Sequence, residues 1–196
     1  MITDFTKEMI PLMTAALLIT ALLRFWRSKY ITTSLQREGA VCIFAAYFAG
    51  LAAVTVIPEA WPSPLFRLRG TISLMPGRIF FDTWREVAAG NWAYLTIAFI
   101  GNIIIFIPIG FFVSLLWRGA SLKKAELAGL LTSVIIELCQ LPLDRWTDID
   151  DLWLNTLGAA IGYLIYVLLN RPQWGLTGTA SHDPWGRTPY RGRGRL

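Results

Sequence analysis

The side chains best suited to binding or catalysis gather between Glu137 and Gly162. This stretch holds five carboxylates, one Arg, one Gln and one Asn, at the meeting of two strongly apolar segments. Acidic groups in apolar surroundings cost free energy unless they are paired, hydrated or bound to a ligand. We therefore expect the functional site in this stretch.

The spacing of these polar residues suits two helices. Glu137 and Gln140 are three residues apart, so they share one face of a helix. Asp148, Asp151 and Asn155 follow at intervals of three and four, which places them along one side of the next helix. Carboxylates also stabilise the positive end of a helix, and an Asp at its start can cap it.

Two further residues belong to this predicted site. Asn102 lies in the apolar segment that contains Pro108, about nine residues from its outer end, or roughly 13 Å deep at the rise of a helix. An amide at that depth needs a hydrogen-bond partner, and other helices supply most such partners. Arg145 lies within the acidic stretch and has the planar geometry that binds phosphate through two hydrogen bonds.

One interpretation is a metal-assisted enzyme. Mg²⁺ and Ca²⁺ prefer oxygen ligands, and the predicted ligands are Glu137, Asp148 and Asp151. A lipid-linked phosphate would then bridge the metal and Arg145.

Two other interpretations remain open. In a non-catalytic binding protein, the same residues form a hydrogen-bonded network, with Arg145 paired to Asp148 or Glu137 and Asn102 paired to Asn155. In a lipid or solute transporter, helices broken at Pro108 and Pro142 would line a pathway, although no inverted repeat is visible in the sequence.

Composition places all of this in a membrane. Of 196 residues, 55% are hydrophobic and only 16% are charged, too few charges to cover a soluble domain of this size. The net charge of +5 is explained by basic loops that set topology and attract lipid headgroups. We therefore expect membrane lipids as partners and no nucleic acid.

Five apolar segments approach the length that crosses a bilayer, roughly 17 to 25 residues. They predict an all-α bundle of about five transmembrane helices, at Met9–Leu23, Ala40–Ile57, Ala93–Trp117, Leu127–Leu141 and Leu152–Leu169. Twelve of the 18 Lys and Arg residues fall in the loops after the first and third segments and in the tail. By the positive-inside rule, the N-terminus is outside, the C-terminus is cytoplasmic, and the acidic stretch faces outward.

The chain divides into a membrane domain and a tail. Residues 1–170 form one transmembrane domain, and residues 171–196, rich in Gly, Pro and Arg, predict a disordered basic cytoplasmic tail. The longest loop runs from Glu59 to Trp92. Within it, Thr83–Ala89 predicts a short interfacial helix with its aromatic neighbours toward lipid.

Two blocks of the sequence resemble the VanZ family of small integral membrane proteins. The blocks are Asn102-x-x-x-Phe106-x-Pro108-x-Gly110, and Glu137-x-x-Gln140 followed by Arg145-x-x-Asp148-x-x-Asp151-x-x-x-Asn155-x-x-Gly158-x-x-x-Gly162. A shorter echo is Ser73-Leu-Met-Pro, where Ser73 replaces the family's usual Asn and Gly77 replaces an aromatic residue, which weakens any role for that loop.

The resemblance implies a multi-pass protein of the cell membrane that lowers susceptibility to teicoplanin-like glycopeptides or other envelope-active agents. It does not imply a particular reaction. Joined to the residues above, it leads us to expect a polar site on the extracytoplasmic side that binds a lipid-linked or phosphate-bearing envelope component.

Overall fold

The computed structural model describes residues 2–28, 34–56, 72–73, 75–117, 119–141 and 147–170. The described chain is helical apart from one pair of two-residue strands. Its elements, in order, are α1 (Ile2–Ser28), α2 (Leu35–Thr55), β1 (Ile72–Ser73), α3 (Arg78–Ala88), α4 (Trp92–Tyr94), the π-helical η1 (Leu95–Ile100), α5 (Gly101–Leu116), α6 (Leu122–Gln140), β2 (Thr147–Asp148) and α7 (Ile149–Leu169). The predicted all-α class is confirmed.

Four helices in the described part of the chain are long and apolar enough to cross a membrane. They are Met9–Arg27, Leu35–Thr55, Trp92–Leu116 and Ile149–Leu169. The remaining predicted segment, Leu127–Leu141, forms α6, which is less apolar because it carries Lys123, Lys124 and Glu126 near its start and Glu137 near its end. It nevertheless packs against both α5 and α7 as the fifth long helix of the bundle.

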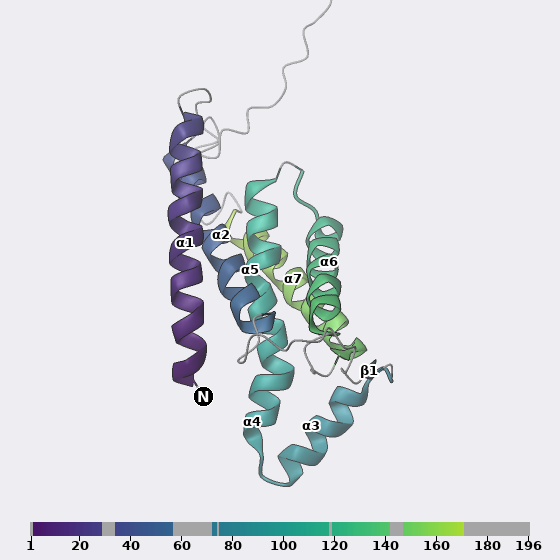
Figure 1. Cartoon of the computed structure of the whole chain (residues 1–196). Helices are drawn as coiled ribbons and strands as arrows, with labels where there is room; N and C mark the ends of the chain where they lie inside the picture. The colour runs from purple at the N-terminus through teal and green to yellow at the C-terminus, as the bar shows by residue number, and fades with distance from the viewer. Residues whose placement is uncertain are drawn as a thin grey trace, which may run out of the picture.

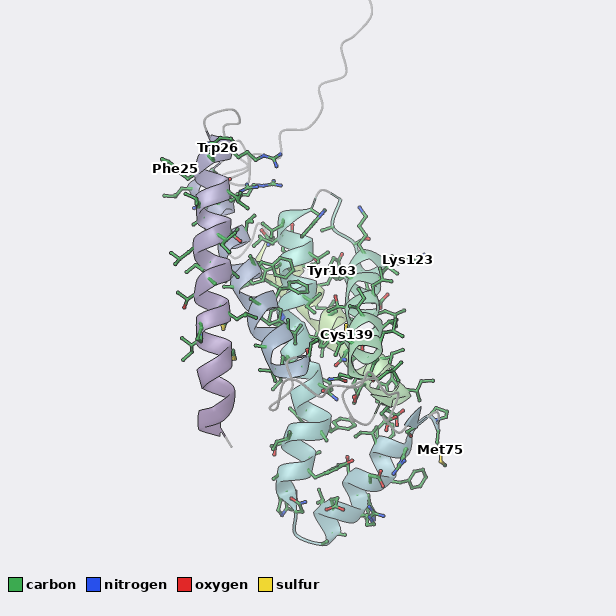
Figure 2. All side chains as sticks on the ribbon, viewed as in Figure 1. Phe25, Trp26, Met75, Lys123, Cys139 and Tyr163 are labelled. Carbon is green, nitrogen blue, oxygen red and sulfur yellow. The ribbon has the colours of Figure 1, made fainter. Side chains whose placement is uncertain are left out.

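The long helices alternate in direction along the chain (Figure 1). α5 is central and contacts α2, α6 and α7, whereas α1 stands at one side against α2. Arg24 of α1 donates two hydrogen bonds to the Glu38 carboxylate of α2. The outward face of α1 is apolar, and Phe25 projects away from the bundle (Figure 2), as expected for a side chain in lipid.

Glycines bring α5 and α7 into backbone contact. A Cβ at Gly158 would lie 2.2 Å from the Ile103 carbonyl oxygen, and one at Gly162 would lie 2.0 Å from that of Ile107. On the facing helix, a Cβ at Gly110 would lie 1.8 Å from the Ala159 carbonyl oxygen. Only hydrogen fits at these positions, so the glycines let the two helices pack closely.

α3, α4 and η1 form an arm at the end of the bundle where α5 and α7 begin (Figure 1). We call this the acidic end, because Asp148, Asp150 and Asp151 lie there. The short helix predicted at Thr83–Ala89 is present but begins earlier, at Arg78. Residues 57–71, which hold much of the predicted outer loop, and the predicted tail at 171–196 lie outside the described part of the chain.

Candidate functional site at the acidic end of the bundle

Asn102 joins α5 to α7. Its Nδ2 donates to Asp151 Oδ1 at 2.6 Å and to the Ala98 carbonyl oxygen at 3.1 Å. Because both partners accept, the orientation of the amide is fixed. Ala98 lies in η1, so Asn102 also holds the π-helical turn to the start of α5.

Asn155 joins α7 to α6, one helical turn deeper. Its Nδ2 donates to Ser133 Oγ at 2.8 Å. The predicted pair of Asn102 with Asn155 is therefore wrong: Asn102 reaches Asp151, and Ser133 supplies the partner of Asn155. Among the described residues, none donates to Asn155 Oδ1, although the residue is only 5% exposed.

Glu137 and Gln140 lie on the α6 side of the same end. The Glu137 side chain is buried, one helical turn from Ser133. Gln140 Nε2 donates to the Thr55 carbonyl oxygen at 2.9 Å, one of the carbonyls that a helix leaves without a backbone donor at its C-terminus. Gln140 therefore ties α6 to the end of α2.

These contacts define a polar cluster between three helices. Its hydrogen-bonded members are Asn102 of α5, Ser133 of α6, and Asp151 and Asn155 of α7. We include the buried Glu137, which lies one helical turn from Ser133 on α6. Figure 2 helps to place it: Lys123 marks the opposite end of α6, and Met75 marks the arm beyond the acidic end. Two hydrogen bonds that cross between helices thus join Asn102 to Asp151 and Asn155 to Ser133.

Asp148 has a local role at the start of α7. It is the N-cap residue, and its Oδ1 accepts from the Asp150 backbone N–H at 3.0 Å. Among the described residues, no three His, Cys, Asp or Glu side chains are grouped so that they could hold a metal ion. The predicted ligands Glu137, Asp148 and Asp151 do not form such a group. Asp148 instead caps its own helix, and Asp151 accepts a hydrogen bond from Asn102. The predicted Arg145 and Pro142 lie outside the described residues.

Asp150 is the buried acidic residue that the spacing argument missed. Its side chain is fully buried and accepts hydrogen bonds from Gly77 N at 2.7 Å, Ile79 N at 2.9 Å and Trp153 Nε1 at 2.8 Å. Two of these donors are backbone groups at the start of α3, where a carboxylate is favourable. Asp150 therefore fastens the arm to the bundle.

The loop before α3 takes part through its backbone. Ile72 and Ser73 pair in parallel with Thr147 and Asp148. Gly77 has a φ of 82°, a conformation that most other residues adopt only with strain. The loop thus has a structural role, and Gly77, one of the two residues in which it differs from the family pattern, suits the backbone conformation found there. The likeness of Ser73-Leu-Met-Pro to the family was the one signal in the sequence that pointed to this loop. Helical spacing gives no sign that the loop lies beside the acidic stretch.

An aromatic cluster completes the junction between the arm and the bundle. Phe80 of α3 stacks on Trp153 of α7 at 5.5 Å between ring centroids and contacts Phe99 of η1 at 5.6 Å. Since Trp153 also donates to Asp150, apolar and polar contacts converge on the same side chain.

Fold and site together define a multi-pass helical membrane protein with a polar cluster between its helices at one end. The chain matches the VanZ/LLP1 family over residues 44–170, well over half of its length, and it belongs to that family. The matched region contains every residue of the polar cluster and leaves out α1. No curated protein and no solved structure matches the chain.

Proposed function

We propose that this VanZ-family protein binds the headgroup of a lipid-linked envelope component at the polar cluster. This binding lowers the susceptibility of the cell to teicoplanin-like glycopeptides. The family membership of the chain and the two hydrogen-bonded pairs near the acidic end support the proposal.

The observation that carries the proposal is the environment of Asn155. Its Oδ1 is buried and accepts no hydrogen bond from the described residues. A buried polar atom without a partner costs about 1–3 kcal/mol. A ligand that donates a hydrogen bond to Asn155 recovers that free energy on binding.

The cluster favours a donor-bearing headgroup. The Nδ2 donors of Asn102 and Asn155 are already used within the protein, and the acidic side chains nearby offer acceptors when ionised. Hydroxyl or amino groups of a lipid-linked sugar complement such a site. Its phosphate requires a basic partner, and Arg145 remains the residue that the sequence predicts for that role.

The acidic end faces the extracytoplasmic side in this proposal. The loops that would lie at the other end, together with the tail, carry twelve of the 18 Lys and Arg residues, and positive loops remain in the cytoplasm. The site then meets lipid-linked components where glycopeptides act, outside the membrane.

Binding to the purified protein in nanodiscs tests the proposal. The probes are a polyprenyl-linked amino sugar, polyprenyl phosphate and unmodified polyprenol, measured by native mass spectrometry. We expect the amino-sugar lipid to bind most tightly, and Asn155→Leu to weaken it about tenfold, the equivalent of one hydrogen bond of roughly 1.4 kcal/mol. Ile104→Ala, a change on the exposed face of α5, is the control and should bind as the wild type does.

Two results contradict the proposal. Equal binding of all three lipids by wild type and Asn155→Leu would mean that the cluster does not recognise the headgroup. Conversion of the amino-sugar lipid to a product, or its movement across a vesicle membrane, would replace binding with catalysis or transport.

A further inference from the structure

The arm helix α3 has three distinct sides. At about 100° per residue, Phe80, Phe81 and Trp84 cover one side, Arg78 and Arg85 come next, and Asp82 and Glu86 follow. Ile79, on the side toward the bundle, is 6% exposed, whereas Phe81 is 72% exposed and Trp84 is 78% exposed. The exposed side thus passes from aromatic to basic to acidic around the helix.

The direction of the aromatic side is fixed relative to the bundle. Asp150 holds the start of α3, and Phe80 packs against Phe99 and Trp153. Phe99 belongs to the apolar span Trp92–Leu116 and is itself partly exposed, and Phe80 beside it is 54% exposed. The aromatic side of α3 is therefore continuous with a surface that faces lipid.

The length of that span sets the depth of the arm. Twenty-five residues of helix extend about 37 Å at 1.5 Å per residue, compared with about 30 Å for the hydrocarbon core of a bilayer. The start of the span, with Trp92 64% exposed, then reaches the interfacial layer that Trp favours. α3 ends at Ala88, only a short turn before Trp92, so it lies next to this point (Figure 1).

We propose that α3 lies in the membrane interface, with Phe81 and Trp84 among lipid acyl chains and with Arg78 and Arg85 at the headgroups. The partner is the bilayer itself, reached by apolar insertion. Arg78 pairs with Asp82 at 3.0 Å, and Arg85 lies 3.6 Å from both Asp82 and Glu86. Because the two basic and two acidic side chains balance, attraction to anionic lipid contributes little.

Site-directed fluorescence quenching tests this placement. Cys42 and Cys139 are replaced by Ala, and bimane is attached to the full chain through Phe81→Cys, Trp84→Cys or, as the control on the polar side, Glu86→Cys. The labelled proteins are reconstituted in vesicles of phosphatidylcholine, with and without phosphatidylglycerol. Nitroxide on the acyl chain reports contact with lipid, and aqueous iodide reports exposure to water.

We expect the acyl nitroxide to quench the labels at positions 81 and 84 several-fold more than the label at 86, to the same extent in both vesicles. Iodide should show the reverse order. Quenching of 81 and 84 by iodide as strong as that of 86 would overturn the proposal, as would protection from both quenchers. Acyl quenching that requires phosphatidylglycerol would overturn apolar insertion. Phe81 and Trp84 are exposed, so the changes at these two positions leave the packing of α3 intact.

Discussion

Asp148 and Asp150 are two residues apart but have different structural roles. Asp148 caps its own helix, where an Asn side chain serves equally well. Asp150 is fully buried and receives three hydrogen bonds, two of them from backbone N–H groups of another element. The same residue type therefore contributes very different amounts to stability.

Asp150→Asn should lower the free energy of unfolding by about 3 kcal/mol, because the amide places a donor against donors that are already buried. Asp148→Asn, the matched control, should change it by less than about 0.5 kcal/mol. Unfolding of the purified proteins in mixed micelles, followed by circular dichroism, measures both. Equal stability of the two variants would contradict the role assigned to Asp150.

At the scale of elements, the contact between α5 and α7 depends on three glycines. The backbones approach so closely at Gly110, Gly158 and Gly162 that a methyl group meets a carbonyl oxygen at each position. Association of helices in lipid relies on such packing, since no hydrophobic gradient drives it.

Gly162→Ala should destabilise the protein by about 3 kcal/mol through overpacking, because its Cβ would lie 2.0 Å from the Ile107 carbonyl oxygen. Gly39→Ala is the control. It lies in α2 with nothing within 4 Å of the added Cβ, so it should stabilise the helix by about 0.5–1 kcal/mol. The same unfolding measurement compares them, and a neutral Gly162→Ala would show that α5 and α7 are farther apart.

Periodic and apolar patterns predicted the long helices well, because each element carries its own signal. The start of α3 escaped prediction because Asp150, 73 residues beyond Gly77, supplies part of its stability. The partner of Asn102 was also mistaken. Depth along a helix indicates that an amide needs a partner, but the register between α5 and α7 decides whether that partner is Asp151 or Asn155.

At the scale of the whole molecule, the sequence drew attention to Asn102, Asp151 and Asn155, and the structure shows that each of them forms a hydrogen bond between helices. The sequence did not identify Ser133 as the partner of Asn155, because a single Ser in an apolar helix carries no signal of its own. The sequence also did not distinguish Asp150 from the neighbouring Asp148 and Asp151. Both roles arise from contacts between elements that are distant in sequence.

Reporter fusions test the orientation that the proposed function requires. Alkaline phosphatase inserted after Gly90, in the turn between α3 and α4, should be active, because the proposed function places the acidic end outside. Green fluorescent protein fused to the C-terminus should fluoresce, because the distribution of Lys and Arg predicts a cytoplasmic C-terminus. The opposite pattern would place the polar cluster on the wrong side for an envelope component.

The double variant Ser133→Ala with Asn155→Leu tests the account most directly. It removes both partners of a buried hydrogen bond together, which leaves no unpaired group and should be nearly neutral for stability. If the polar cluster binds an envelope component, cells that express the variant should become as susceptible to teicoplanin as cells without the protein, at unchanged amounts in the membrane. Full protection by a stable double variant would show that the cluster only holds the helices together.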